Sequence, residues 1–433
     1  MGFHAYFSDS LICIRHPGAA RHTRVFLIGS EEADVSGNFG AAIPGLNTGQ
    51  LATFEFGRSI FKKSFTRREG LGPHFNATSC ASCHEDPVEG GSSQHYRDFF
   101  LAGRLNQEGI LEKIYPDCTE FNAPSQRTEC CLPSMVIPHY GPRGDNENPV
   151  ASGVEHPSLS QADVIAIRNA PPMFGLGLFR LVSDEEILSR ADPQDANGDG
   201  ISGRINRIED ENNQIGRFGY KCQTASIEAF NRGALNNQMG ITSNSIEFAM
   251  GPAQDEKPFL DELFEIKTAY AQVAAPMDEL TDYDGIPDPE LSRGELIALV
   301  FFQENLAAPR RGRITSSVRQ GESVFLQLGC TSCHTASLNT RIGKIHPYTD
   351  LLLHDMGPEL ADGIIMKQAL GNEFRTQPLW GLCEHSPFLH DGRAATVREA
   401  ILLHGGEAEG ARNAYAELNQ RDTLMLHRFL ESL

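Results

Sequence analysis

The stretches Cys80-Ala-Ser-Cys83-His84 and Cys330-Thr-Ser-Cys333-His334 carry one pattern, C-x-x-C-H, at two places 250 residues apart. Two thiols at this spacing reach the two vinyl groups on one edge of a porphyrin, and the adjacent histidine can bind the iron. A zinc site would need four ligands around one metal, and a thioredoxin-like motif would lie in a βαβ pattern, which neither stretch has. The sequence therefore predicts two covalently bound haem c groups. The predicted attachment residues are Cys80, Cys83, Cys330 and Cys333, and the predicted iron ligands are His84 and His334.

Length and composition describe a globular protein of several domains. The chain has 433 residues, which corresponds to roughly two to four domains, and its residues are 40% hydrophobic and 22% charged. The 37 basic and 57 acidic residues give a net charge of 37 − 57 = −20. A chain this acidic repels phosphate, so we expect no nucleic acid partner, whereas a basic protein would suit it. No stretch approaches ~18 consecutive apolar residues, so we also expect no membrane span.

The cellular compartment is predicted from the haem motifs and not from the N-terminus. Haem c attachment implies export to the periplasm or an equivalent space, where disulfides also persist. The N-terminal segment contains no clear signal peptide, because the apolar run Val25–Gly29 is too short and basic residues interrupt the rest. We therefore expect a periplasmic protein, in which Cys118 could pair with Cys130 or Cys131.

Capping patterns and apolar periodicity predict a mainly α-helical chain with long loops. Residues 86–158 are rich in Pro, Gly, Asn and Ser, which predicts loops, and strand-like alternation is sparse. The expected helices are 49–64, short helices from Ser160-x-x-Asp163 and from Ser183-x-x-Glu186, a helix from Ser292-x-x-Glu295 that ends by Pro309, and helices at 316–328, 396–404 and 411–431, the last with a restart at Asn419-x-x-Asp422.

The chain also repeats itself, which predicts two tandem cytochrome c-like domains. Gly57-x-x-x-Phe61 precedes the first haem motif, and Gly321-x-x-x-Phe325 precedes the second. After each motif comes a Gly-Arg pair and then a helix, with Gly216-Arg217 in the first copy and Gly392-Arg393 in the second. The predicted domains are an irregular N-terminal extension at residues 1–40, an N-terminal haem domain with insertions at 41–290 and a C-terminal haem domain at 291–433.

A loop between the two haem motifs has the spacing of a cation site. Asp195-x-Asn197-x-Asp199-Gly200 places oxygen ligands at alternate positions with glycine at the sharp turn, as in the first half of an EF-hand. The twelfth position of the loop is Asn206 instead of a bidentate glutamate, so the EF-hand is incomplete. Two interpretations remain open: Asp195, Asn197 and Asp199 bind Ca²⁺, or they form a solvated turn rich in Asp, Asn and Gly.

Beyond the two motifs, several segments resemble the di-haem cytochrome c peroxidase superfamily, which includes the MauG-like proteins. The similarity covers about residues 45–433 and is greatest to the branch of di-haem oxidoreductases that is also called thiol-oxidoreductase-like. The resemblance implies one low-spin haem, the C-terminal one, which relays electrons, and one N-terminal haem with an open or openable distal face, where peroxide reacts. The segments that carry it are Gly72–Cys80, Arg168–Gly177, Asp195–Arg204, Gly216–Lys221, His354–Gly357, Phe374–Leu382 and Phe388–Arg393.

The resemblance also implies further site residues. In the peroxidases a distal ligand of the relay haem lies at the end of the helix after the Gly-Arg pair, and here that position is His404. Alternative candidates for this ligand are His354, His385 and His390. The peroxidases place a glutamate over the reactive haem for acid–base catalysis, but the comparable position here is Gln238, and Glu228 stands where they often carry glutamine. Gln238 and Glu228 are thus the candidate catalytic residues, with exchanged roles or with weak or absent peroxidase activity.

The leading hypothesis is a periplasmic di-haem oxidoreductase that resembles cytochrome c peroxidase. Electrons would pass from a small donor protein such as a cytochrome c to the C-terminal haem and then to the N-terminal haem, which reduces peroxide or oxidises another substrate. Two alternatives remain: a non-catalytic di-haem electron-transfer cytochrome, and a MauG-like enzyme that oxidises a partner protein. The resemblance also implies calcium near the haem pair, in agreement with the loop at Asp195.

Overall fold

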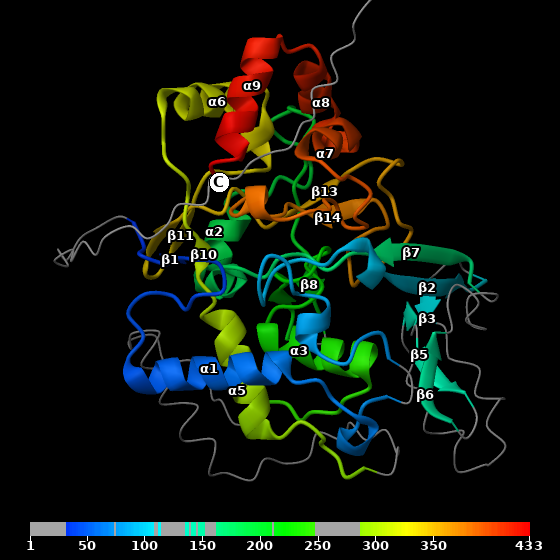
Figure 1. Ribbon diagram of the computed structural model, residues 1–433. Helices are drawn as coiled ribbons and strands as arrows, with labels where there is room; N and C mark the ends of the chain where they lie inside the picture. Colours follow the sequence, from blue (N-terminus) through cyan, green and yellow to red (C-terminus); the bar gives the residue numbers. More distant parts are fainter. Residues whose placement is uncertain are drawn as a thin grey trace, which may run out of the picture.

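The computed structural model describes residues 32–72, 75–107, 111–113, 135–137, 140–143, 146–151, 162–209, 212–246 and 286–433. Within these residues, helices and long connecting loops predominate, and the strands form several small sheets (Figure 1). None of the described helices is long and apolar enough to cross a membrane. The α-helices are α1 (Thr48–Lys62), α2 (Asp184–Leu188), α3 (Ile227–Ala234), α5 (Arg293–Glu304), α6 (Ser316–Gln327), α7 (Val397–Leu403), α8 (Glu409–Ala416) and α9 (Gln420–Leu430).

Side-chain caps fix where most of these helices begin. Asn47 accepts a hydrogen bond from the Gln50 amide and Gln50 accepts one from the Asn47 amide, both 2.9 Å long, so α1 begins one residue before its predicted start. Ser292 and Glu295 form the same reciprocal capping box at the start of α5. The predicted restart at Asn419 is confirmed, because this residue caps α9 and separates it from α8.

A small antiparallel sheet occupies part of the chain for which the sequence predicted loops and a helix. Its central strand, β2 (Phe99–Leu105), pairs with β3 (Leu111–Lys113), β4 (Val136–Ile137) and β7 (Val164–Arg168). The helix predicted from Ser160-x-x-Asp163 is wrong, because residues 164–168 form β7, which pairs with β2. Along this strand the exposed Ile165 and Ile167 alternate with the buried Ala166 and Arg168. The remaining strand pairs are β1 (Ser36–Gly37) with β10 (Ala308–Pro309), β5 (Tyr140–Arg143) with β6 (Asn146–Ala151), β8 (Arg207–Ile208) with β9 (Gln214–Ile215), β11 (Leu338–Thr340) with β12 (Gly343–Ile345), and β13 (Leu353–Asp355) with β14 (Glu373–Arg375).

Each haem motif follows a helix that crosses a second helix at a glycine. In α1, a Cβ atom built on Gly57 would lie 1.9 Å from the Ala298 carbonyl oxygen of α5. In α6, a Cβ atom built on Gly321 would lie 1.9 Å from the Met425 carbonyl oxygen of α9. Only glycine permits backbones to approach this closely, so both crossings depend on the missing side chain.

A pair of phenylalanine rings lies one turn beyond each glycine. The rings of Phe61 and Phe302 have centroids 5.2 Å apart and planes at 52°, and those of Phe325 and Phe429 have the same separation and angle. The first pair belongs to the larger hydrophobic core of the molecule, and the second pair belongs to a smaller, separate core. The repeated G-x-x-x-F pattern therefore encodes one packing arrangement that occurs twice.

The packing of α5 bears on the boundary between the two predicted haem domains. α5 lies across α1, and nearly all of its residues are buried in the larger core (Figure 1). Shortly after α5, β10 pairs with β1. The predicted domains, 41–290 and 291–433, stay a prediction; they assign α5 to the C-terminal domain, although it packs against α1 in the larger core.

Replacing Gly321 with alanine is expected to lower the free energy of unfolding by about 1–3 kcal/mol, because the added methyl group would overlap the Met425 carbonyl oxygen. Denaturant-induced unfolding measures this change. Gly294 in α5 provides the control, since a Cβ atom there meets no atom within 4 Å and alanine favours a helix over glycine. The Gly294→Ala variant should be as stable as the parent or more stable. Equal destabilisation of both variants would contradict a role for the close crossing.

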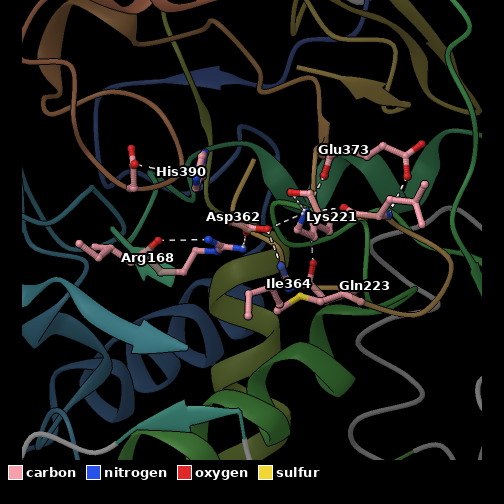
Figure 2. Close-up of polar contacts among 12 residues, drawn as sticks. Arg168, Lys221, Gln223, Asp362, Ile364, Glu373 and His390 are labelled. Atoms are coloured by element: carbon pink, nitrogen blue, oxygen red, sulfur yellow. Dashed lines mark hydrogen bonds and ion pairs between the residues drawn. The ribbon is translucent and has the colours of Figure 1, made fainter. Parts of the chain in front are cut away.

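A buried ionic network joins the segment before α5 to the segment after the second haem motif (Figure 2). Its cations, Arg168, Arg204 and Lys221, come from the part before α5, and its carboxylates, Asp362 and Glu373, come from the part after the second haem motif. Figure 2 labels all of these residues except Arg204. Asp362 pairs with Arg168 and lies 3.3 Å from Lys221 Nζ, while Glu373 pairs with Arg204. Lys221 is fully buried and donates to the carbonyl oxygens of residues 370, 371 and 373. Because each charge finds its partner across the boundary, the network fixes how the two parts pack.

Candidate functional site

The second haem motif lies at the end of α6. Gly329, with a φ of 81°, follows the helix, and a 3₁₀ turn occupies Cys330–Ser332. The amide of His334 donates to the Cys330 carbonyl oxygen (2.9 Å), so the turn holds both cysteines and the histidine together. The His334 ring lies 6.3 Å from the ring of Phe325, at the edge of the smaller core. The motif is thus positioned by a helix that is itself held by the glycine crossing.

A cavity of about 510 Å³ lies beside this motif and has the size of a cofactor site. Its wall contains Cys330, Cys333 and His334, and it also contains His404. The fold therefore brings the predicted attachment residues and both predicted iron ligands of the second haem to one cavity. Much of the remaining wall is apolar, as a porphyrin requires, and includes Phe325, Leu379, Trp380, Leu382 and Ile401.

His334 and His404 share a hydrogen-bonding arrangement that suits iron ligands. His334 Nδ1 donates to the Tyr348 carbonyl oxygen (2.9 Å), and His404 Nδ1 donates to the Ala400 carbonyl oxygen (2.7 Å). These bonds orient the rings and leave Nε2 of each for a metal. Burial lowers the pKa of His334 to about 4 and also lowers the pKa of His404, so both rings are neutral, the form that binds metals. The donor set fits a haem iron with two histidine ligands.

The three alternative histidines also line the cavity, but their contacts differ. His354 has a carboxylate at each ring nitrogen, with Asp350 at Nε2 (2.8 Å) and Glu407 at Nδ1 (2.6 Å), so neither nitrogen is available for a metal. Burial lowers the pKa of His385 to about 4 and that of His390 to about 2, so both are neutral. These contacts argue against His354, and His404 remains the predicted distal ligand.

The first haem motif has the same local fold as the second. Residues Cys80–Ser82 form a 3₁₀ turn, and the amide of His84 donates to the Cys80 carbonyl oxygen (3.1 Å). His84 Nδ1 lies 3.1 Å from the carbonyl oxygens of both Gly91 and Pro171, and burial lowers the pKa of the ring. This neutral imidazole is therefore held through Nδ1, like that of His334, with Nε2 left for a metal.

Two loops, each closed by a β-bridge, precede α3 and α7. They show how the two copies of the predicted repeat align with each other. An isolated β-bridge closes residues 218–224, and another closes residues 388–394. Two residues after each bridge, the side chains of Ser226 and Thr396 cap α3 and α7. The helix starts at Ser226 and Thr396 therefore correspond, whereas the two Gly-Arg pairs do not, because their positions relative to the bridge differ by six residues.

The alignment of these two helix starts compares the distal positions of the two motifs. His404 is the eighth residue after Thr396 (404 − 396 = 8), and the eighth residue after Ser226 is Ala234 (234 − 226 = 8). The first unit therefore has alanine where the second has an imidazole. After Ala234 the chain continues into a π-helical turn, Leu235–Met239, a feature that is frequent at functional sites.

The two candidate catalytic residues lie in different surroundings. Gln238, in the π-helical turn, accepts a hydrogen bond from the Asn76 side chain at Oε1 and one from the Asn76 amide at its carbonyl oxygen, both 2.7 Å long. The buried carboxylate of Glu228 accepts from the Ser245 hydroxyl (3.2 Å) and from the Ile246 amide. The described contacts therefore connect Gln238 with the segment that leads to the first haem motif, whereas those of Glu228 lead to residues after the π-helical turn.

The predicted calcium ligands lie in an exposed loop that is closed by its own hydrogen bonds. The Asn197 side chain accepts from the Asp199 amide and the Asp199 side chain accepts from the Ile201 amide, both at 2.9 Å. The Asp195 carboxylate accepts from the Gly200 amide at 3.2 Å. In the part of the chain that the structure describes, no three His, Cys, Asp or Glu side chains gather closely enough to hold a metal ion. Calcium binding by Asp195, Asn197 and Asp199 stays a prediction.

Removal of calcium tests this prediction. A bound Ca²⁺ would stabilise the native state by mass action, so a calcium chelator is expected to lower the melting temperature of the parent protein by a few degrees. An Asp199→Ala variant should melt at the lower temperature with or without chelator, because it lacks one ligand oxygen pair. A parent protein that melts at the same temperature in excess Ca²⁺ and in chelator would contradict the site.

The cysteines outside the haem motifs include one residue that the sequence did not assign. Cys383 is bonded in a disulfide. Cys222 is a buried free thiol, and burial raises its pKa to about 12, so it stays protonated and unreactive. The predicted pairing of Cys118 with Cys130 or Cys131 lies outside the described residues.

Solved structures with similarity to this chain share little sequence with it. A variant of the diheme peroxidase BthA from Burkholderia thailandensis is 13% identical, with 88% of this chain and 85% of that chain covered and a TM-score of 0.35. A MauG-like protein associated with microbial copper homeostasis is 15% identical, with 60% and 89% covered and a TM-score of 0.27. Kuenenia stuttgartiensis hydrazine synthase is 20% identical, and the similarity covers 33% of this chain and only 56% of the synthase chain, with a TM-score of 0.25. No curated protein matches the sequence.

The sequence of the chain also matches a family profile. The match covers residues 140–433, which include the second haem motif and His404, and the family is described as "Di-haem oxidoreductase, putative peroxidase". The first haem motif, at Cys80, precedes the matched range. Because the match covers more than half of the 433 residues, the chain belongs to the di-haem oxidoreductase family.

Proposed function

We propose that the chain binds two haem c groups covalently, one at each C-x-x-C-H motif, and that it transfers electrons between them. Membership of the family supports haem as the cofactor. Covalent attachment is supported by the two pairs of free cysteines, each next to a neutral histidine that is held through Nδ1. Bound haem would supply reversible one-electron storage and, where a coordination position is open, the cleavage of O–O bonds.

The C-terminal site is proposed to relay electrons. The observation that carries this proposal is the pair of neutral imidazoles, His334 and His404, in the wall of one cavity with Nε2 of each ring left for a metal. Two such ligands make an iron six-coordinate and leave no position for peroxide. The site therefore suits electron transfer and not substrate binding.

The N-terminal site is proposed to be the reactive one. Ala234 stands at the position that corresponds to His404, and its methyl group cannot ligate iron, so a haem bound here would lack a ligand from this position, which supports an open distal face. Reduction of one H₂O₂ to two H₂O consumes two electrons and two protons. Gln238 can orient peroxide by hydrogen bonding, but its amide exchanges no proton at neutral pH, so the protons would come from solvent.

Several expectations about the cellular setting belong to the same proposal. The disulfide of Cys383 supports the periplasm, because disulfides persist in oxidising compartments. The net charge of −20 supports a small basic electron donor such as a cytochrome c. The repeated glycine crossing and the two separate cores support two tandem cytochrome c-like units, which meet after β10.

One observation favours a second candidate, a non-catalytic di-haem cytochrome. The π-helical turn near the first haem motif offers Gln238, an amide, where a peroxidase needs a proton donor. In this alternative both irons have two protein ligands, and the chain only carries electrons.

The optical spectrum and peroxide turnover together test the proposal. Purified holoprotein from a host competent in cytochrome assembly should show one low-spin and one high-spin ferric haem. It should also oxidise reduced cytochrome c when H₂O₂ is added, with two equivalents consumed for each peroxide. Two low-spin haems and no response to peroxide would overturn the reactive site and leave the electron carrier. A colourless protein would overturn both candidates.

A further inference from the structure

A group of three charged side chains lies beside the second haem motif. His354, in β13, is 3% exposed; its Nε2 lies 2.8 Å from Asp350 Oδ2 and its Nδ1 lies 2.6 Å from Glu407 Oε2. The Asp350 and Glu407 side chains are 2% and 10% exposed, so water contributes little to any of the three. We refer to Asp350, His354 and Glu407 as the carboxylate–imidazolium triad.

The geometry fixes the charge of the triad. A carboxylate oxygen accepts hydrogen bonds, so a carboxylate at each ring nitrogen requires a proton on each nitrogen of His354. The two carboxylates outweigh the loss of hydration and raise the pKa of His354 well above its usual value. One imidazolium and two carboxylates leave the triad with a net charge of −1.

The triad adjoins the haem motif and the cavity. His354 Nδ1 lies 3.5 Å from the Sγ atom of Cys333, which is a predicted attachment residue, and both His354 and Glu407 form part of the cavity wall. On the other side, the Ser202 hydroxyl donates to Glu407, and Gly203 lies against the imidazole ring, where a Cβ atom would stand 3.1 Å from His354 Cε1. The triad is therefore enclosed and cannot move away from the cavity.

We propose that the carboxylate–imidazolium triad sets the reduction potential of the haem bound at Cys330 and Cys333, by holding one net negative charge at the edge of its cavity. The inference rests on the proposed haem at this motif and extends it to residues that bind neither iron nor porphyrin. Reduction of Fe(III) to Fe(II) adds one electron from the donor, and a buried negative charge nearby opposes this addition. At a separation of about 10 Å and an effective dielectric constant of about 20, one unit charge changes the reduction equilibrium roughly tenfold.

Neutral isosteres of the two carboxylates test the proposal. In Glu407→Gln and, separately, in Asp350→Asn, the net charge of the triad rises from −1 to zero while the shape stays the same. Each variant should shift the equilibrium of this haem towards Fe(II) about tenfold, which for one electron is about 59 mV towards higher potential. Loss of one carboxylate lowers the pKa of His354, and a neutral ring would leave the net charge at −1. The potential is therefore measured over a series of decreasing pH values, and the shift is expected where the ring keeps both protons.

Glu417→Gln provides the matched control, because Glu417 is an exposed carboxylate in the same part of the chain. Its removal should change the reduction equilibrium of this haem by no more than about twofold, since water screens surface charge. Potentials are followed in the low-spin optical band, which also reports whether His334 and His404 remain bound in each variant.

The outcomes separate this inference from the proposed function. If the parent protein shows a low-spin haem and at least one of the two triad variants keeps it, an unmoved potential overturns the role of the triad. A shift towards lower potential, or an equal shift in Glu417→Gln, does the same. Absence of a covalent haem at the second motif in the parent protein would overturn the proposed function and, with it, this inference.

Discussion

A variant with alanine at both Cys330 and Cys333 is expected to carry one covalent haem where the parent protein carries two. Thioether bonds need both thiols, and the second motif offers no other free cysteine in the described part of the chain. Mass spectrometry of the denatured chain measures the loss directly, because only covalent haem stays with the polypeptide. The remaining haem should be the high-spin one, so the low-spin optical signal should disappear with the lost mass.

Two further variants serve as a comparison and a control for this experiment. Replacing Cys80 and Cys83 should also remove one haem, but the low-spin signal should persist, since it belongs to the second motif. Cys222→Ala, which removes a buried free thiol outside both motifs, should keep both haems. Two haems retained in the Cys330/Cys333 variant, or no covalent haem in the parent, would refute attachment at this site.

His404→Ala should convert the low-spin haem to a high-spin form. The imidazole of His404 is the predicted sixth ligand, and its removal leaves iron bound only through His334 on the protein side. Free imidazole added to the variant should restore the low-spin spectrum, because the cavity left by the side chain can admit the same ligand. Peroxide should then react at both haems in the variant without imidazole, since both irons have an open position.

The matched control is His346→Ala, which removes a half-exposed histidine that contacts Glu32 and lies outside the cavity wall. This control should keep the parent spectrum. An unchanged low-spin spectrum in His404→Ala would remove His404 as ligand and would direct attention to His385 and His390, whose neutral rings line the same cavity.

Local signals in the sequence were sufficient for several of the helix starts. Ser183 and Ser292 cap α2 and α5 at the predicted positions because a cap depends on one side chain and on an amide three residues away. The two haem motifs are equally local: the turn that joins Cys330 to His334 is complete within five residues. The sequence therefore predicted these features without knowledge of the fold.

The features that the sequence missed depend on contacts between distant segments. β7 forms because its residues pair with β2, and the sequence before it resembled a capping box that pointed to a helix. Glu407 reaches His354 across 53 residues (407 − 354 = 53), and no local pattern announces that contact. The register of the repeat is set by bridges that close 218–224 and 388–394, and a bridge leaves no signature in residue identity.

The charge network of Figure 2 has a consequence for how the chain can be divided. A fragment that ends after β10 would contain Arg168 and Lys221 without Asp362, and the complementary fragment would contain the carboxylate without its cations. Each piece alone would leave buried charges without their partners, so we expect neither to fold by itself, whereas two co-expressed pieces should reassemble through these opposite charges. The network would therefore hold the two proposed haem sites at a constant separation, so the proposed electron transfer between them would need no hinge motion.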